Sequence, residues 1–346
     1  MSSPNGKYPF FTCSKDTLLI DTYTFDCEAI LIAGNGDIGH AKYYSGKFDA
    51  YQRTYVLWGF RDDAHFVQNA IDKYLPFKVK LETQGGAMPY IKLSTLQELS
   101  LPMTSIQEQH RVANFLSLID SRIVAQRRLV KLLKKHKRGV IEQIFGRRLD
   151  MGKDAEKWDI VELRDLFSKV ACRNRDGKVK NVITNSAEFG LIPQRDFFDK
   201  SIAVDGNTDG YYVIRTGDFV YNPRKSTTAP FGPFNRYVGT EDGIISPLYT
   251  CLVPKGKANP EYLAWYFRST AWHRYVYDNG SQGARHDRVN MTDDLLFGIP
   301  VLLPPIAVQE RIADGLNTID ARWSSASKVL AHLEKMKRGL LQQLFA

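Results

Sequence analysis

Cysteine is scarce in this chain. Among its 346 residues there are only four cysteines, Cys13, Cys27, Cys172 and Cys251, and no two of them form a Cys-x-x-Cys pair. Zinc-binding patterns and disulfide frameworks depend on paired or regularly spaced cysteines, so this spacing argues against both. A reducing compartment suits such a chain, and we predict a cytoplasmic protein.

Long apolar runs are also missing. No stretch approaches the roughly 18 apolar residues of a membrane-spanning helix. The start of the chain, Met1–Lys7, does not place an apolar segment after a basic region, as a secretory signal would. We therefore expect no contact with a membrane.

Motifs for catalysis or cofactor binding are weak. The seven histidines are dispersed, and no carboxylate cluster after an apolar strand indicates a nuclease metal site. Residues 34–39 have the glycine spacing of a dinucleotide-binding loop, but no helix-like stretch follows them. Residues 222–225 begin like the catalytic loop of adenine methyltransferases. Arg224 and Lys225, however, replace the second proline and the aromatic residue that would stack on a flipped base. We expect no catalytic residue, metal or cofactor in this chain.

The net charge of +9 is concentrated in one stretch. Residues 122–148 hold ten basic side chains against the single acidic residue Glu142, whereas residues 1–105 carry 10 basic and 11 acidic side chains. Residues 149–305 carry 20 of each. The basic stretch is either a solvated helix face or a strip that lies near nucleic acid phosphates or an acidic partner.

An internal duplication organises the chain. Residues 106–145 align without a gap on residues 306–345, and 15 of the 40 positions are identical. The repeat distance is far longer than the roughly 20–50 residues of a solenoid repeat. The chain is therefore predicted to be built as module, spacer, module, spacer.

Each copy of the duplicated segment carries apolar residues at alternating steps of four and three. Such a seam, held for about five heptads, predicts a long helix that packs on another long helix. Gln126 and Lys137 interrupt the first seam, and Lys337 interrupts the second. The alternative is an ordinary amphipathic helix on a globular core, but such helices usually run about 8–20 residues. We predict an antiparallel pair that forms a rigid rod between the modules. The seam residues are Val112, Leu116, Ile119, Ile123, Val130 and Leu133 in the first copy and Ile312, Leu316, Ile319, Trp323, Leu330 and Leu333 in the second.

The two longer segments, residues 1–102 and 149–302, mix strand-like and helix-like runs and predict α+β modules. Their C-terminal parts align with an offset of 198, which places Gln84 on Gln282 and Pro102 on Pro300. The expected strands are residues 28–33, 51–57, 211–214, 218–221 and 248–253, and the expected helices are residues 64–75 and 260–277.

Polar, glycine-rich loops interrupt both modules at matched places. Asn, Gln, Arg and Ser side chains on loops form hydrogen bonds with base edges and phosphates, although each loop by itself could be a plain turn. We predict DNA contacts at these positions. They are Asn222, Arg224, Lys225, Ser226, Ser281, Gln282, Arg285 and His286 in the second module and Lys7, Tyr8, Asn35, Lys42, Arg53 and Gln84 in the first.

Three strings connect the chain to a known family. Residues 303–313 (LPPIAVQERIA), residues 6–11 (GKYPFF) and residues 28–36 (EAILIAGNG) resemble the DNA specificity subunits of type I restriction–modification systems. The start of the long helix also occurs in a second form, with Leu101-Pro102 followed by residues 109–113 (QHRVA). The resemblance covers essentially the whole chain.

The resemblance implies a non-catalytic protein. Residues 1–102 and 149–302 would be target recognition domains, each reading one half of a split sequence in double-stranded DNA. Residues 103–148 and 303–346 would be spacer helices that set the gap. Two methyltransferase subunits, which use S-adenosylmethionine to methylate adenine, would dock on this chain. Motor–nuclease subunits, the users of ATP and Mg²⁺, would join through that core.

The first module departs from the family pattern. The second module opens with residues 158–166, about 142 residues before Pro300, whereas only 101 residues precede Pro102. By resemblance, the first module is short by roughly 30–40 residues. Two alternatives therefore stay open. One is a scaffold or decoy that binds methyltransferase subunits without reading a full bipartite site. The other is a self-contained methyltransferase or nuclease with degenerate motifs.

Overall fold

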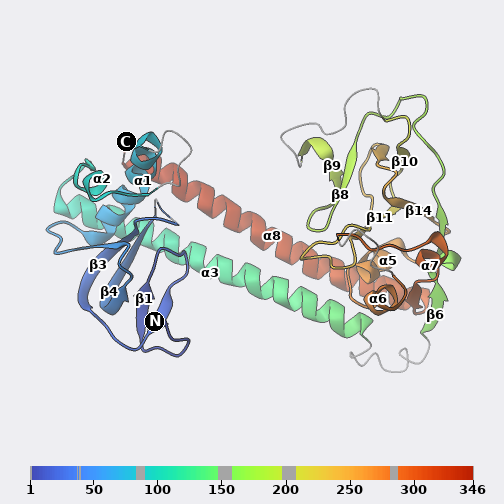
Figure 1. Ribbon diagram of the computed structural model, residues 1–346, viewed down its shortest axis with the longest axis horizontal. Helices are drawn as coiled ribbons and strands as arrows, with labels where there is room; N and C mark the ends of the chain where they lie inside the picture. Colours follow the sequence, from blue (N-terminus) through green and yellow to red (C-terminus); the bar gives the residue numbers. More distant parts are fainter. Residues whose placement is uncertain are drawn as a thin grey trace. The chain divides into compact units, whose positions relative to one another are not determined.

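Two helices of about 40 residues run through the chain, α3 (Ile106–Phe145) and α8 (Ile306–Leu344), as the sequence predicted (Figure 1). The computed structural model describes residues 2–36, 38, 40–82, 90–146, 158–196, 208–280 and 287–345. The chain divides into two compact units. Unit 1 comprises Met1–Val130 with Ser325–Ala346, and unit 2 comprises Lys131–Ser324. Each unit therefore contains the start of one long helix and the end of the other.

Unit 1 is built on a five-stranded sheet in the order β2-β1-β4-β3-β5. Its neighbouring strands are antiparallel except for β1 and β4, which run parallel. Helix α1 (Ala64–Glu82) packs Ile71 and Leu75 against Ile30 and Ile32 on one face of the sheet. The strands are β1 (Tyr8–Phe11), β2 (Leu18–Ile20), β3 (Phe25–Ala33), β4 (Ala41–Ala50) and β5 (Thr54–Trp58), and the short helix α2 (Leu93–Gln97) precedes α3.

Unit 2 contains a four-stranded antiparallel sheet in the order β12-β11-β14-β7 and three two-stranded pairs, β10-β13, β15-β6 and β8-β9. Its strands are β6 (Asp159–Glu162), β7 (Phe167–Lys169), β8 (Ile183–Ser186), β9 (Gly190–Pro193), β10 (Tyr212–Ile214), β11 (Phe219–Tyr221), β12 (Phe234–Arg236), β13 (Gly243–Ile245), β14 (Thr250–Pro254) and β15 (Pro300–Leu303). Its helices are α4 (Leu163–Leu166), the 3-10 helix η2 (Gln194–Asp196), α5 (Pro260–Phe267), α6 (His273–Asn279) and α7 (Asp293–Phe297).

The helix expected over residues 260–277 is broken in two. Asn259 caps α5 by accepting hydrogen bonds from the backbone N–H groups of Glu261 and Tyr262. After α5, the Ser269 hydroxyl donates to the Tyr266 carbonyl at 2.6 Å and accepts from the Ala271 N–H at 3.2 Å. Serine side chains that bond to nearby backbone compete with the helical pattern, which explains the break.

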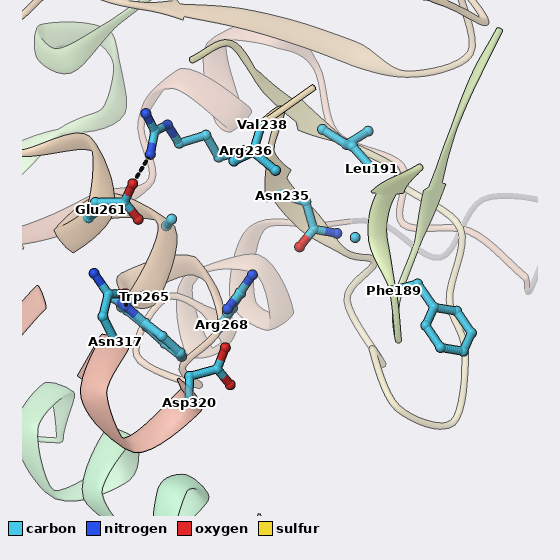
Figure 2. Close-up of a pocket in the computed structure, with 12 residues that line it drawn as sticks. Phe189, Leu191, Asn235, Arg236, Val238, Glu261, Trp265, Arg268, Asn317 and Asp320 are labelled. Carbon is cyan, nitrogen blue, oxygen red and sulfur yellow. Dashed lines mark hydrogen bonds and ion pairs between the residues drawn. The ribbon is translucent and has the colours of Figure 1, made fainter. Parts of the chain in front are cut away.

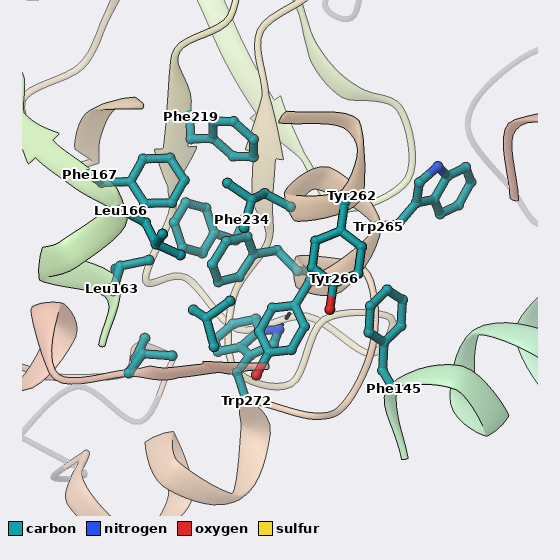
Figure 3. Close-up of a cluster of buried hydrophobic side chains, with 14 of the residues drawn as sticks. Phe145, Leu163, Leu166, Phe167, Phe219, Phe234, Tyr262, Trp265, Tyr266 and Trp272 are labelled. Atoms are coloured by element: carbon teal, nitrogen blue, oxygen red, sulfur yellow. Dashed lines mark hydrogen bonds between the residues drawn. The ribbon is translucent and has the colours of Figure 1, made fainter. Parts of the chain in front are cut away.

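An aromatic core holds unit 2 together (Figure 3). Phe167, Phe219 and Phe234 from the sheet meet Tyr262 and Tyr266 of α5, and all five side chains are at most 3% exposed. Each such ring removes about 150–250 Å² from water, so this cluster contributes much of the apolar burial. In the described part of the chain, no helix combines the length and apolar character needed to cross a membrane.

The two units match at an offset of 200. Helices α2 and α7 span residues 93–97 and 293–297, and α3 and α8 begin at 106 and 306. In the structure, Leu101 is therefore equivalent to Val301 in the repeat. The offset of 198 that the sequence alignment gave is wrong for this segment. The sequence alignment matched Pro102 with Pro300, but at the offset of 200 these two prolines are not equivalent.

Candidate nucleic-acid interface

The loop after β11 carries four of the predicted DNA contacts of the second module. Asn222 is buried; its Nδ2 atom donates to the Asn185 carbonyl at 3.3 Å, and its Oδ1 atom accepts from the Arg224 N–H at 3.0 Å. The loop backbone passes close to Gly232, where a Cβ atom would lie 2.0 Å from the Asn222 carbonyl oxygen. Asn222 thus holds the loop in shape, while Arg224 and Ser226 are exposed.

This loop forms backbone hydrogen bonds with residues 287–289, which directly follow the other predicted contacts of this module. The Lys225 N–H donates to the Asp287 carbonyl at 2.8 Å, and the Val289 N–H donates to the Pro223 carbonyl at 2.9 Å. Ser281, Gln282, Arg285 and His286 lie outside the described residues. The structure therefore brings the Asn222 loop against residues 287–289, and all eight positions remain predicted DNA contacts.

Arg224 places an exposed positive charge on this surface. The Arg224 guanidinium is 66% exposed and lies 3.4 Å from the Asp287 carboxylate, so the pairing is loose. Exposed ion pairs of this kind contribute only about 0–1 kcal/mol, and a phosphate or base edge could replace Asp287 at low cost. Arg224 can then offer two parallel N–H donors to a guanine or a phosphate.

Arg288 is a candidate that the sequence reasoning missed. It forms an antiparallel bridge with Arg224. Its buried Nε atom has no hydrogen-bond partner among the described residues and lies 3.8 Å from the Asp287 carboxylate. Burial raises the pKa of the nearby Tyr249 hydroxyl, and the positive charges of Arg224 and Arg288 oppose that rise. The signal was present in the sequence, because Arg288 continues the polar run of Arg285 and His286.

In the first module, three predicted contacts gather around residues 12–14. The Lys42 Nζ atom donates to the Ser14 carbonyl at 2.8 Å, and the Cys13 thiol donates to the Arg53 carbonyl at 3.3 Å. Asn35 precedes Gly36, which has a φ of +73°, and a Cβ atom there would lie 2.7 Å from the Cys13 carbonyl oxygen. Asn35, Lys42 and Arg53 therefore share one end of the sheet.

The other three predicted residues of the first module are not part of this group. Tyr8 pairs with Ile20 at the opposite end of β1, and its ring lies 5.0 Å from the ring of Tyr23. Lys7 is exposed beside it. Gln84 lies outside the described residues.

A second polar surface in unit 2 was not predicted. A cavity of about 210 Å³ lies between β12, α5 and α8 (Figure 2). Trp265 forms part of its wall and donates from Nε1 to the Asn317 Oδ1 atom at 2.8 Å, and Arg236 pairs with Glu261 across the same cavity. Among the described residues, no group of His, Cys, Asp and Glu side chains is arranged to hold a metal.

The duplicated glutamine fixes each module to the start of its long helix. In unit 1, the Gln109 Oε1 atom accepts from the Asp63 N–H at 3.0 Å, and its Nε2 atom donates to the Thr104 carbonyl at 2.9 Å. In unit 2, Gln309 accepts from the Asn259 N–H at 2.8 Å and donates to the Pro304 carbonyl at 2.7 Å. Both side chains are buried, so the same contact has been kept in both copies.

The end of each long helix is anchored by a duplicated phenylalanine. Phe345 packs on Phe66 of α1 in unit 1, with ring centroids 4.9 Å apart. Phe145 packs on Tyr262 of α5 in unit 2, with ring centroids 5.6 Å apart. Each module thus contacts the beginning of one long helix and the end of the other.

The duplicated lysines that interrupt the seams form ion pairs between the helices. Lys137 lies 2.6 Å from Asp320 in unit 2, and Lys337 lies 2.6 Å from Asp120 in unit 1. Positions 120 and 320 are equivalent in the repeat, as are 137 and 337. The interruptions in the apolar pattern are therefore cross-helix contacts. In unit 1, Arg127 of α3 also pairs with Glu334 of α8, so higher numbers on α3 meet lower numbers on α8 and the two helices are antiparallel there.

The predicted seam residues lie along these contacts. Most of those near the helix starts are buried, and those farther along are half-buried. The buried ones are Val112, Leu116, Ile119, Ile123, Ile312 and Leu316, and the half-buried ones are Val130, Leu133, Ile319, Trp323, Leu330 and Leu333.

Comparison with known proteins gives a consistent result. Residues 2–134 match the family model of the type I restriction modification DNA specificity domain. The specificity subunit of the Escherichia coli type I restriction enzyme EcoDI is 31% identical over 141 residues, which is 40% of this chain and only 31% of that protein. A putative type I specificity subunit of Methanocaldococcus jannaschii, MjaX, is 24% identical over 326 residues, covering 86% of this chain and 68% of that protein.

Solved structures show the same fold. The S subunit of a type I restriction–modification system from M. genitalium superposes with a TM-score of 0.62 at 15% identity, covering 100% of this chain and 90% of that chain. A chain from a structure of type I system assembly and conformational transition gives a TM-score of 0.56 at 14% identity, covering 99% of this chain and 92% of that one.

Proposed function

Because this chain is related to the DNA specificity subunits of type I restriction–modification systems, we propose that it is the non-catalytic subunit that selects the DNA sequence. The observation that carries the proposal is the duplicated attachment of two α+β modules, through Gln109 and Gln309, to two long paired helices. A chain that reads two separated half-sites needs two readers and a spacer between them.

The proposal assigns residues 1–102 and 149–302 as the two target recognition domains and residues 103–148 and 303–346 as the spacer helices. Each domain would contact one half of an asymmetric site in double-stranded DNA. The loop with Arg224 and Lys225, joined to Arg288, supports this role in the second domain. Phosphate contacts would position the domain, and base contacts would specify the sequence.

The long helices also offer a surface for the methyltransferase subunits. On α3 in unit 1, Phe115, Leu118 and Leu129 are 47%, 72% and 45% exposed, while Leu116 and Ile119 face the buried seam. Exposed apolar side chains at helical spacing are typical of a face that packs on a partner helix. Two methyltransferase subunits would dock on the helices, and motor–nuclease subunits would join through them.

The cofactors in this arrangement belong to the partner subunits. S-adenosylmethionine would bind to the methyltransferases, and ATP and Mg²⁺ to the motor–nucleases. The four cysteines are unpaired thiols, which supports a place in the reducing cytoplasm.

The test is to co-express this chain with its methyltransferase subunit in a methylation-free host and to map methylated adenines by long-read sequencing. We expect one split motif with two defined halves and a fixed gap. Expression of the methyltransferase alone is the control. Methylation of unrelated sites, or methyl transfer by the purified chain alone, would refute the proposal.

A scaffold that docks methyltransferases without reading a full site is the second candidate. One observation favours it: the pair formed by β6 and β15 in unit 2 has no counterpart among the described residues of unit 1. Assembly of the complex without any bipartite methylation would support this candidate.

A further inference from the structure

Helix α3 carries a basic strip in unit 2, formed by Lys131, Lys134, Lys135 and Arg138. These residues stand at positions i, i+3, i+4 and i+7, so their side chains share one face of the helix. All four are exposed. At the rise of an α-helix, the strip places four positive charges along about 10 Å of its length.

Little acidic charge balances this strip. Among the described residues, Arg138 pairs with Glu142 at 2.9 Å, and the three lysines form no ion pair. Lys131 and Lys135 stand four residues apart, as do Lys134 and Arg138, and like charges at this spacing destabilise a helix. An anionic partner would relieve the repulsion between them.

The repeat shows that this charge is not needed for the packing of the long helices. The equivalent face of α8 in unit 1 has a net charge of +1 instead of +4, because it carries Ala331, Glu334, Lys335 and Arg338. The neighbouring structure is nevertheless the same in both copies, since the duplicated lysines form cross-helix ion pairs and the duplicated phenylalanines anchor a module. The extra charge at positions 131 and 134 therefore has a role other than helix pairing.

The strip lies on the side of α3 that carries the second module. Phe145 follows Arg138 by seven residues, or about two turns, and so shares its face of the helix. Phe145 packs on Tyr262 and Tyr266 of α5, with ring centroids 5.6 Å and 5.5 Å apart. The basic strip is therefore continuous with the helix face that contacts the module.

We propose that the strip binds phosphates of double-stranded DNA without reading their sequence, so that the spacer helix holds the duplex beside the second module. Lysine and arginine neutralise phosphates and release counterions, and this requires charge instead of a shaped pocket. A protein partner fits the strip less well, because the cores of protein interfaces are depleted of lysine and enriched in aromatic side chains. None of the four strip positions is apolar. The inference rests on the proposed function, which makes DNA the ligand of this chain.

The test measures the salt dependence of DNA binding by fluorescence anisotropy. It uses a labelled duplex of random sequence and the co-expressed complex of this chain with its methyltransferase subunits. Each phosphate contact contributes about −0.9 to the slope of log K against log salt, which corresponds to about eightfold in affinity between about 1 M and 0.1 M salt.

The first variant gives α3 the residues that α8 already has at the equivalent positions, Lys131→Ala together with Lys134→Glu, so it should fold. We expect its slope to be shallower by about 2 and its affinity at about 0.1 M salt to fall roughly 50-fold. The loss should be the same for a random duplex and for one that carries the methylated motif, because phosphate contacts carry no sequence information.

A matched pair of single variants separates the strip from general charge. Lys135→Ala and Lys335→Ala remove an exposed lysine from equivalent positions of the two helices. Lys135→Ala should reduce the slope by about 1, whereas Lys335→Ala should leave it unchanged, because Ala331 and Glu334 stand beside it. Equal losses in the two variants would overturn the proposal.

Two other results would also overturn it. One is an unchanged slope in the Lys131→Ala, Lys134→Glu variant. The other is failure of that variant to assemble with the methyltransferase in size-exclusion chromatography, because the strip would then bind the protein partner. Both results leave the methylation pattern directed by the native chain untouched, so they are distinct from a failure of the proposed function. Absence of any duplex binding by the native complex would overturn both proposals.

Discussion

Replacing the buried glutamine of either copy should uncouple one module from the long helices. Gln309→Ala would leave the Asn259 N–H and the Pro304 carbonyl without the partners that now lie at 2.8 Å and 2.7 Å. Each unsatisfied buried group costs about 1–3 kcal/mol. We expect a loss of about 3 kcal/mol in the free energy of unfolding of unit 2.

Gln109→Ala should cost a similar amount in unit 1. It removes the partners of the Asp63 N–H and the Thr104 carbonyl, and also a 2.8 Å bond from Nε2 to the Asp62 carboxylate. Asp62 is half-buried and can turn toward water, so its loss adds little. The expected decrease is again about 3 kcal/mol.

Urea titration can separate the two effects, because the tryptophans are unevenly distributed. Unit 1 holds Trp58, and unit 2 holds Trp158, Trp265, Trp272 and Trp323. The urea midpoint followed by tryptophan fluorescence should therefore fall strongly for Gln309→Ala and little for Gln109→Ala. For Gln109→Ala, the loss of stability in unit 1 should appear as faster hydrogen exchange of the α1 backbone amides.

Exposed neighbours on the same helices supply the controls. Gln107→Ala in unit 1 and Glu310→Ala in unit 2 should change stability by no more than about 0.5 kcal/mol. If the glutamine variants lay within about 0.5 kcal/mol of these controls, the buried contacts would not be what fixes the modules to the helices.

Three further predictions concern charge. Burial raises the pKa of the Asp72 carboxyl to about 6 from 3.8. Because the folded state holds this proton more tightly, stability should fall as pH rises from about 4 to 6, and Asp72→Asn should be more stable than the native chain at pH 7 by at most about 3 kcal/mol in urea titration. Arg224→Ala should weaken specific DNA binding by about 1–3 kcal/mol in a filter-binding assay, if the residue contacts a base. A double-mutant cycle of Lys137→Ala and Asp320→Ala should give a coupling energy of about 1 kcal/mol, because both side chains are partly shielded from water.

Each of these predictions has a result that contradicts it. An Asp72→Asn advantage that persists unchanged at pH 4 would mean that the carboxyl does not titrate as described. Arg274→Ala is the control for Arg224, since Arg274 pairs with Asp278 within α6; equal effects of the two would indicate nonspecific charge. A coupling energy of zero would make the Lys137 contact incidental.

Local pattern was sufficient to predict the long helices. The seam in residues 106–145 and 306–345 depends only on side-chain periodicity, and α3 and α8 begin at the first residue of each copy. The break after Phe267 was not visible in this way, because it depends on the hydroxyl of Ser269 choosing a backbone partner. Competition between two local hydrogen-bond patterns leaves no periodic signal.

The candidate interface was only partly predictable. Loop composition identified Arg224 and Lys225, but it could not show that Asn222 is buried within the loop it helps to shape. Nor could it bring Asp287 beside Arg224, because that contact joins residues 63 positions apart. Composition reports which side chains can bind DNA, whereas tertiary packing decides which of them face solvent.

The repeat itself explains the lysines that break the seam. A lysine in an apolar stripe looks like a defect when one helix is considered alone. In the pair, Lys137 reaches Asp320 and Lys337 reaches Asp120, so each copy supplies the partner for the other. This reciprocity is the rule for an isologous interface, in which residue i contacts j and j contacts i. A duplicated helix that pairs with its own copy must satisfy that rule within one chain. A substitution at position 120 is therefore constrained by Lys337, and a substitution at position 137 is constrained by Asp320.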